Sequence, residues 1–239
     1  MSLDIIAAYC SYAMTSSSGD CSAGYYCKYG VDRHQPEGIN ETCTPYGNMT
    51  GVGGPCWTGH YCPAGRAQTF DLYPCPPGYF CPPLTTRADQ YPCPSGTFYN
   101  TTGARNESDC LPCTLGSYCE LDGLSEPSGL CSPGWYCNGS STSSTPTLNG
   151  GECQPRTFCP EGSHQPTPCT PGMYCQVQGL FSPSGNCTPG YYCSLSADTS
   201  TPTDGITGDQ CPLGHFCPLG SASPIPCDQG YYLNTTQQV

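Results

Sequence analysis

The chain has 239 residues, a formal net charge of −12 and 23 cysteines. Its six lysines and arginines form no basic stripe that could contact phosphates, so we expect no nucleic-acid partner. The longest aliphatic stretch, near residues 5–8, is too short for a membrane span or for the core of a signal peptide.

Cysteines must supply the core of this protein. Leu, Ile, Val and Phe together number only 29, too few for an ordinary hydrophobic core. About one residue in ten is a cysteine, which is the density of a disulfide scaffold. Bridges of this kind contribute roughly 2–4 kcal/mol each and persist only in an oxidising compartment. We therefore expect an extracellular or cell-surface location.

A short cysteine pattern recurs along the chain. Nine segments fit C-x-x-x-x-x-C, each with Tyr or Phe directly before the second cysteine, and Gly stands at the fourth position in eight of them. They begin at Cys21, Cys56, Cys75, Cys113, Cys131, Cys153, Cys169, Cys187 and Cys211. Pro often precedes the glycine, and Pro-Gly favours a type II turn with positive φ at Gly. The exception is Arg156, where we expect a turn of another type.

The aromatic residue of the pattern stands next to a cysteine. In an extended segment, neighbouring side chains point to opposite faces. We therefore expect each ring to pack on a neighbouring bridge or on a proline.

Longer repeats contain the short ones. In chain order we predict a divergent N-terminal unit (1–74), an inserted module (75–112), two copies of one unit (113–168 and 169–226), and the start of a further module (227–239). The two copies align at offsets of 56 and 58, for example "GLSEPSGLC" with "GLFSPSGNC". Cys10 has no cysteine six residues before it, and the counterpart of Cys110 would fall beyond Val239. We expect the chain to be a segment of a longer array.

These observations predict small disulfide-rich repeats, mostly irregular with short β-hairpins, strung into an elongated rod. We place twenty cysteines in bridges: Cys10, Cys21, Cys27, Cys43, Cys62, Cys75, Cys81, Cys93, Cys119, Cys131, Cys137, Cys153, Cys159, Cys169, Cys175, Cys187, Cys193, Cys211, Cys217 and Cys227.

Two pairing schemes stay open, because connectivity cannot be read from sequence. One closes each C-x5-C segment locally, joins Cys93 to Cys110, and strands Cys10, Cys43 and Cys227. The other joins each second cysteine to the next first cysteine, needs a Cys110–Cys113 bridge, and strands Cys56. We favour the second, because it encloses the variable loops. Cys43 or Cys56 would be the free or inter-chain thiol.

The only C-x-x-C, "CLPC" at residues 110–113, lacks the second ligand pair of a zinc site and the βαβ context of a redox motif. We expect disulfide cysteines there. His60 and His215 occupy a variable position of the turn, so we expect them to be surface residues and not metal ligands.

The segments "CPPGYFC" (75–81) and "CPSGTFYNTTGARNESDCLPC" (93–113) resemble ephrin-receptor-like and growth-factor-receptor-type cysteine-rich repeats, near relatives in style of EGF-like arrays. The resemblance covers nearly the whole chain. It implies a rod of small modules on a cell surface or appendage, as in mastigoneme-type proteins of flagellar hairs. It supplies no catalytic residue, and the calcium-binding EGF consensus is missing.

Sugar-acceptor sequences are dense. N-x-[ST] occurs at Asn40, Asn48, Asn100, Asn106, Asn138, Asn186 and Asn234. All lie in polar stretches, where N-glycan acceptors belong. The equivalent segments "NGSSTSSTPT" (138–147) and "SLSADTSTPT" (194–203) predict either O-glycan carriers or plain loops.

The sequence therefore predicts a structural glycoprotein segment of an extracellular fibre, surface appendage or matrix, which associates with itself or with neighbouring modules. The alternative is a ligand-binding or adhesion stalk of a cell-surface receptor. We expect no enzyme, cofactor or metal site, since the sequence shows no nucleophile motif, phosphate loop or rigidly held carboxylate pair.

Overall fold

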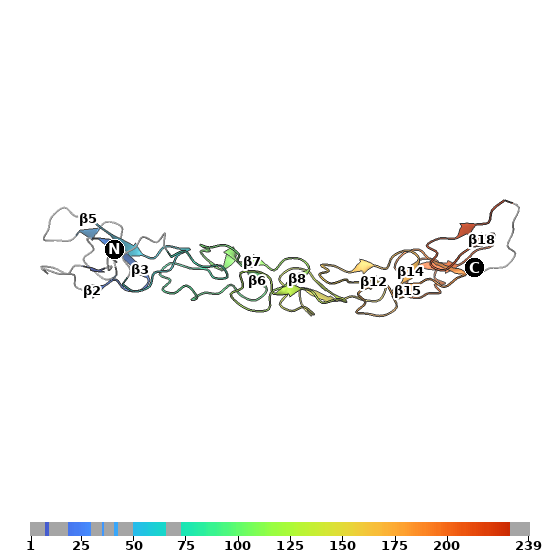
Figure 1. The fold of residues 1–239 in the computed structure, drawn as a ribbon, viewed down its shortest axis with the longest axis horizontal. Coiled ribbons are helices and arrows are strands. Elements are labelled where there is room, and N and C mark those ends of the chain that lie inside the picture. Colours follow the sequence, from blue (N-terminus) through green and yellow to red (C-terminus); the bar gives the residue numbers. More distant parts are fainter. Residues whose placement is uncertain are drawn as a thin grey trace, which may run out of the picture. The chain divides into compact units, whose positions relative to one another are not determined.

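The computed structural model describes residues 8–9, 19–29, 35, 41–42, 50–65 and 73–229. These ranges hold many short strands, one short 3-10 helix and no α-helix (Figure 1). The predicted class, small disulfide-rich repeats that are mostly irregular with short β-hairpins, is confirmed. None of the described helical segments is long and apolar enough to cross a membrane.

The strands are two to six residues long and pair antiparallel. In the first half of the chain they are β1 (Ala8–Tyr9), β2 (Gly19–Asp20), β3 (Tyr25–Tyr29), β4 (Glu41–Thr42), β5 (Thr50–Pro55), β6 (Thr97–Phe98) and β7 (Leu111–Pro112), with the helix η2 (Glu107–Asp109). The sheets formed there are β1-β2, β3-β5-β4 and β6-β7.

In the second half every sheet is a two-stranded hairpin. The strands are β8 (Ser117–Tyr118), β9 (Gly129–Leu130), β10 (Trp135–Cys137), β11 (Gly150–Glu152), β12 (Thr157–Phe158), β13 (Thr167–Pro168), β14 (Met173–Tyr174), β15 (Gly185–Asn186), β16 (Tyr191–Cys193), β17 (Gly208–Gln210), β18 (His215–Phe216) and β19 (Ile225–Pro226). Consecutive strands pair, from β8-β9 to β18-β19. The order β8-β9, β10-β11, β12-β13 is repeated by the next six strands with the same strand lengths.

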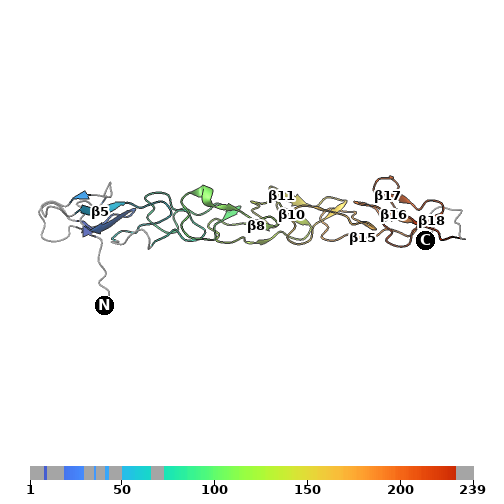
Figure 2. The same cartoon turned by 90° about the horizontal axis from the view of Figure 1, so that it is seen from above.

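The chain divides into two compact units. The first comprises Met1–Pro112 and Leu121–Pro127, and the second comprises Cys113–Glu120 and Ser128–Val239. Within the second unit, the strands lie one after another in space in the same order as in the sequence. Figure 2 shows this for β8, β10, β15, β16 and β18.

The predicted type II turn forms inside the disulfide loops. In the loop 131–137, the amide of Trp135 donates to the carbonyl of Ser132 at 3.0 Å, and Gly134 between them has a φ of 85°. Pro133 presets the first central residue and glycine takes the left-handed conformation, as a type II turn requires. The corresponding glycines of the other loops have φ between 77° and 86°.

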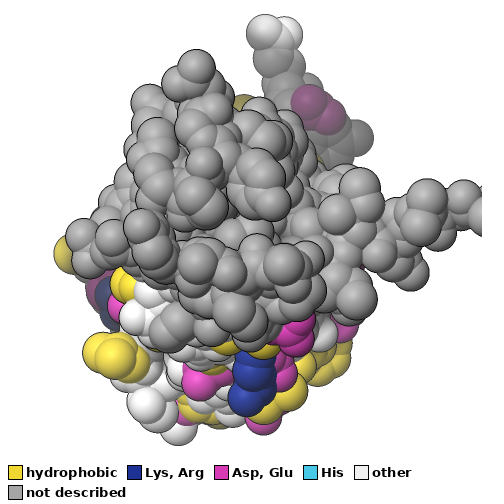
Figure 3. Space-filling view, turned by 90° about the vertical axis from the view of Figure 1, so that its left-hand side faces the viewer, with side chains coloured by type: hydrophobic (Ala, Val, Ile, Leu, Met, Phe, Trp, Pro, Cys, Tyr) yellow, Lys and Arg dark blue, Asp and Glu magenta, His cyan; other side chains and the backbone are white. Residues whose placement is uncertain are grey.

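Cystines replace an aliphatic core. Every bridged cysteine is at most 9% exposed, and most are fully buried. By contrast, no described leucine is buried. On the face drawn in Figure 3, hydrophobic side chains lie interspersed with acidic and basic ones. The aliphatic residues of this chain therefore stabilise the fold little, and the bridges with the main chain around them must do so instead.

Candidate functional site: the repeat interfaces and their exposed loops

The bridges are local. Nine of the ten described disulfides join cysteines six residues apart: Cys21–Cys27, Cys56–Cys62, Cys75–Cys81, Cys113–Cys119, Cys131–Cys137, Cys153–Cys159, Cys169–Cys175, Cys187–Cys193 and Cys211–Cys217. The tenth joins Cys93 to Cys110. Our preference for the sequential scheme is therefore wrong. The turn folds the two cysteines of each C-x5-C segment to a Cα separation near 6 Å, which suits a disulfide.

The cysteines that the two pairing schemes treat differently have separate outcomes. Cys56 is bridged to Cys62, so it is not the free thiol that we considered. Cys227, which we placed in a bridge, is a free cysteine in this structure. Cys10 and Cys43 lie outside the described residues. Within "CLPC", Cys110 and Cys113 bridge to different partners, as structural cysteines.

Each disulfide loop is joined to the next by main-chain hydrogen bonds through its turn glycine. The amide of Gly134 donates to the carbonyl of Cys159 at 2.8 Å, and the amide of Cys153 donates back to the carbonyl of Gly134 at 2.9 Å. The same reciprocal pair recurs at Gly24, Gly59, Gly116, Gly172 and Gly190 with the cysteines of the following loop. The glycine therefore serves the contact between repeats as well as the turn.

A second pair of hydrogen bonds comes from the turn that follows each loop. The amide of Gly162 donates to the carbonyl of Cys131 at 3.0 Å, and the amide of Cys137 donates to the carbonyl of Ser163 at 2.9 Å. Four main-chain hydrogen bonds thus connect the loop 131–137 with residues 153–163, two to the next loop and two to the turn after it. Since buried main-chain groups must be paired, each repeat depends on its neighbour to satisfy its own loop.

Six of the eight turn glycines also have no room for a side chain, whereas Gly214 faces open space. A Cβ at Gly116 would overlap the carbonyl oxygen of Gly162, and one at Gly134 would overlap that of Gly179. In both pairs the second glycine belongs to the turn after the next loop but one. The close approach of these main chains explains why glycine recurs at this position, beyond the need for positive φ.

Arg156 is the exception, and our expectation for it is wrong. Its φ is 79°, so the turn keeps the same type as the glycine turns. Its amide donates to the carbonyl of Cys175, and its own carbonyl accepts from the amide of Cys169, both at 2.9 Å. The Arg156 side chain is exposed, and its Nε donates to Oδ2 of Asp198 at 3.0 Å. The main-chain contact between repeats therefore holds even a residue for which this φ is unfavourable.

The aromatic residues before the second cysteine have two contacts. Tyr26 lies in a buried cluster with Cys56 and Cys62, and Tyr174 packs against Cys187 and Cys193. At these two positions the prediction that the ring packs on a neighbouring bridge is confirmed. Burial raises the pKa of the Tyr26 hydroxyl above its ordinary value, an effect that a hydrogen bond with Trp57 opposes.

In most hairpins, the size of the residue paired across the hairpin correlates with whether tyrosine or phenylalanine precedes the second cysteine. The rings of Tyr118, Tyr136 and Tyr174 face the glycines paired with them across the hairpin, and a Cβ at those glycines would lie only 3.3–3.4 Å from the ring. Phenylalanine instead faces a larger residue, as in Phe158–Thr167 and Phe216–Ile225. A ring that covers a cross-strand glycine compensates for its missing side chain.

Four of the predicted N-glycan acceptors lie in described residues, and all four are exposed: Asn100, Asn106, Asn138 and Asn186. Asn106 caps η2, since its Oδ1 accepts from the amide of Ser108 at 3.0 Å and also from the Ser108 hydroxyl. The amide nitrogen of its side chain, the atom that carries an N-glycan, takes no part in that cap. Asn40, Asn48 and Asn234 lie outside the described residues.

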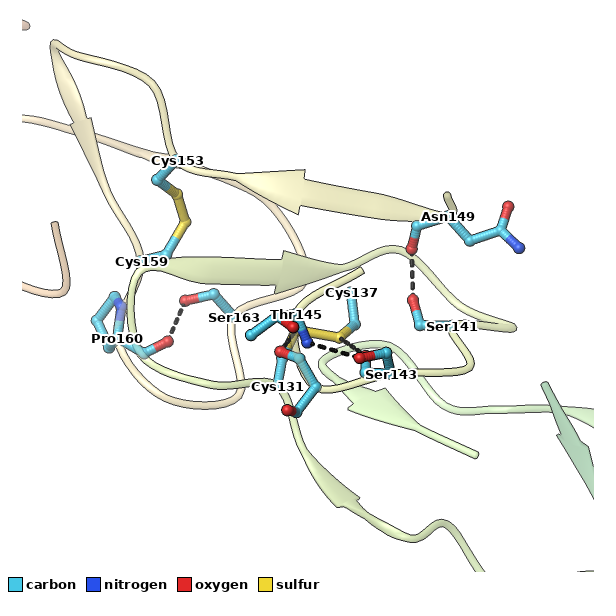
Figure 4. The surroundings of a disulfide bond; sticks show 11 residues. Cys131, Cys137, Ser141, Ser143, Thr145, Asn149, Cys153, Cys159, Pro160 and Ser163 are labelled. Carbon is cyan, nitrogen blue, oxygen red and sulfur yellow. Dashed lines mark hydrogen bonds between the residues drawn. A yellow bond between two sulfur atoms is a disulfide. The ribbon is translucent and has the colours of Figure 1, made fainter. Parts of the chain in front are cut away.

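Two equivalent serine- and threonine-rich loops lie between bridges of the second unit. The first (138–149) is closed by a hydrogen bond from the amide of Asn138 to the carbonyl of Asn149, and the second (194–207) by one from Ser194 to Thr207, both at 2.8 Å. The carbonyl of Ser144 accepts from Ser132 and lies 3.4 Å from the sulfur of Cys131. These contacts hold the first loop against its own bridge (Figure 4). The carbonyl of Ser200 contacts Thr188 and Cys187 in the same way in the second loop.

The histidines at the variable turn position, His60 and His215, each make a local contact with a main-chain carbonyl through Nδ1. That atom lies 3.2 Å from the carbonyl of Leu213 in His215 and 3.4 Å from the carbonyl of Thr58 in His60. Each carbonyl belongs to the residue two positions earlier, so the contact stabilises the turn itself.

Comparison with known proteins adds no family. No protein-family model matches the chain, and a search of the curated proteins finds no match. The tandem bridged hairpins are those of a cysteine-rich repeat array, and the resemblance to ephrin-receptor-like repeats stays a hypothesis.

Proposed function

We propose that this chain is a structural segment of an extracellular glycoprotein, a building block of a fibre, surface appendage or matrix. The observation that carries the proposal is the main-chain contact between successive disulfide loops. It uses the centre of each repeat to hold the next one, which is how repeat proteins build extended load-bearing elements. The elongated rod, the N-glycans and the kinship with ephrin-receptor-like repeats belong to the same proposal.

The location follows from the same residues. Ten bridges within the described part of the chain could not persist in a reducing cytosol. Four exposed sequons and an acidic, lysine-poor surface fit a chain that stays hydrated outside the cell. The proposal gives the chain no catalytic role, cofactor or nucleic-acid partner.

The test is electron cryo-microscopy and light scattering of native, unreduced material. The proposal predicts assemblies in which the chain repeats along an axis, with sugar density at Asn100 and Asn138. Particles that stay single at micromolar concentration and carry a bound partner would contradict it. That result would favour the ligand-binding or adhesion stalk.

A further inference from the structure

We propose that Thr145, Thr147, Thr201 and Thr203 are acceptor sites for O-linked sugars, two on each serine–threonine loop. The inference deepens the proposed function and rests on it, since the chain must pass the glycosyltransferases of an export pathway. It commits to named hydroxyls, and the structure separates these from the many other hydroxyls of the same loops.

The two loops share an inward-facing proline. Pro146 and Pro202 are buried, and each lies against a glycine, Gly150 and Gly208, at which a Cβ would overlap the proline ring. The proline also cannot donate a hydrogen bond and has a fixed φ. The chain is therefore held at this point, and the residues on either side of the proline are turned to the surface.

The threonines that flank the proline are exposed in both copies. Thr145 and Thr147 flank Pro146, and Thr201 and Thr203 flank Pro202. In the described part of the chain the structure gives none of the four hydroxyls a hydrogen bond. Thr142 is also exposed, but its counterpart in the second loop is Asp198, so that position is not shared.

Other hydroxyls of the loops are engaged in the fold. Ser141 is buried and donates to the carbonyl of Asn149 (Figure 4). The hydroxyl oxygens of Ser143 and Thr199 accept from the amides of Thr145 and Thr201, at 3.2 and 3.3 Å. A sugar on Ser141 would remove the proton that it donates, and a sugar on Ser143 or Thr199 would crowd the amide that donates to its oxygen. A sugar on the four flanking threonines would disturb no such contact.

The reaction uses a nucleotide-activated sugar as the co-substrate. The threonine hydroxyl attacks the anomeric carbon, a new bond forms between that carbon and Oγ1, and the bond from the carbon to the nucleotide phosphate breaks. The hydroxyl proton is taken up by a base of the transferase, and the nucleotide leaves with the electron pair. A Thr-Pro-Thr segment that is already ordered and exposed costs a transferase little entropy to bind.

The test is site mapping on the whole 239-residue chain secreted from eukaryotic cells. After enzymatic removal of N-glycans, peptides from both loops are fragmented by electron transfer, which keeps sugars attached to their residues. We expect monosaccharide or longer additions on Thr145, Thr147, Thr201 and Thr203, and none on Ser141.

The paired variant Thr145→Val with Thr147→Val supplies the matched control. Valine keeps the branched shape but has no hydroxyl, so the first loop should lose its sugars while the second loop of the same molecule keeps them. Sugars that remain on the first loop of this variant would overturn the assignment. So would bare threonines in a chain whose cysteines are oxidised and whose Asn100 carries a glycan, a result that leaves the proposed function intact. Reduced cysteines with no sugar anywhere would overturn both proposals.

Discussion

The first and second serine–threonine loops are built on the same frame and differ at their tips. Each loop is closed by one main-chain hydrogen bond, and one of its carbonyls lies against the disulfide that precedes the loop. In each loop a buried proline also packs against a glycine. The first loop then uses a buried hydroxyl, Ser141, to hold its end. The second has Ala197 at that position and two additional residues, and Asp204 holds its tip instead.

This difference shows which part of the repeat is fixed. The main-chain contacts that touch a bridge or a neighbouring repeat are the same in both loops, while the contacts at the tip have been replaced. The residues at a loop's tip can change because their hydrogen bonds stay within the loop. The main-chain contacts shared by both loops cannot change as easily, because they must fit a neighbouring repeat.

We expect the largest loss of stability from substitution of the glycine that packs against the buried proline of each loop. Gly150→Ala and Gly208→Ala each place a Cβ onto a main-chain carbonyl, that of Tyr136 or Tyr192, and onto the proline ring. Such an overlap forces main-chain shifts, so we expect a loss of about 3 kcal/mol in each copy. Urea denaturation of the oxidised protein measures it. A loss in one copy only would show that the frames are not equivalent.

The buried hydroxyl gives the next effect. Ser141→Ala removes a donor to the Asn149 carbonyl and should cost about 1 kcal/mol. The reverse change, Ala197→Ser, places a hydroxyl at the matching buried position of the second loop. If the frames match, it should find the Thr207 carbonyl and cost little. The difference between the two free energies of unfolding checks this, and an Ala197→Ser variant that loses more than Ser141→Ala would contradict it.

The second tip should respond to acid while the first does not. Hydrogen bonds from the amides of Ile206 and Thr207 lower the pKa of the Asp204 carboxyl. A lowered pKa means that the stabilisation is present above the ordinary value near 4 and is lost as the pH falls through the lower value of the folded protein. Amide exchange at Ile206 and Thr207 should therefore speed up at acid pH relative to that at Leu148 and Asn149, after correction for intrinsic rates. Asp204→Asn should remove the difference.

The smallest effect is expected at Arg156, whose side chain reaches from its turn to Asp198 in the second loop. Exposed ion pairs contribute about 0–1 kcal/mol, and an arginine at positive φ carries strain of comparable size. Arg156→Gly should therefore leave stability within about 1 kcal/mol of the native chain and make it less dependent on salt. Gly134→Arg is the opposite control, and it should prevent secretion because the carbonyl of Gly179 occupies the space.

The sequence predicted the fold class and the turns because both depend on short-range chemistry. Pro-Gly sets the turn, and cysteine density replaces the core, so neither needs knowledge of distant contacts. The exposure of Asn100, Asn106, Asn138 and Asn186 follows similarly from their polar surroundings.

The pairing of the cysteines and the φ of Arg156 could not be predicted, because contacts between repeats decide them. The sequential scheme assumes that a bridge is needed to enclose each variable loop. In the structure, main-chain hydrogen bonds such as that from Gly134 to Cys159 hold the segments between bridges, and the bridges can then be local. The same hydrogen bonds hold Arg156 in a conformation that its side chain disfavours.

The most direct test of this account is cleavage of the unreduced, denatured protein on the amino side of aspartate. Cuts before Asp198, Asp204, Asp209 and Asp228 separate the segment with Cys187 and Cys193 from the segment 209–227. With local bridges, the peptide 209–227 leaves as a free fragment that contains one internal disulfide, Cys211–Cys217. If it stays joined to the preceding segment through Cys193 and Cys211 until a reductant is added, the bridges are sequential and the account of locally closed loops is wrong.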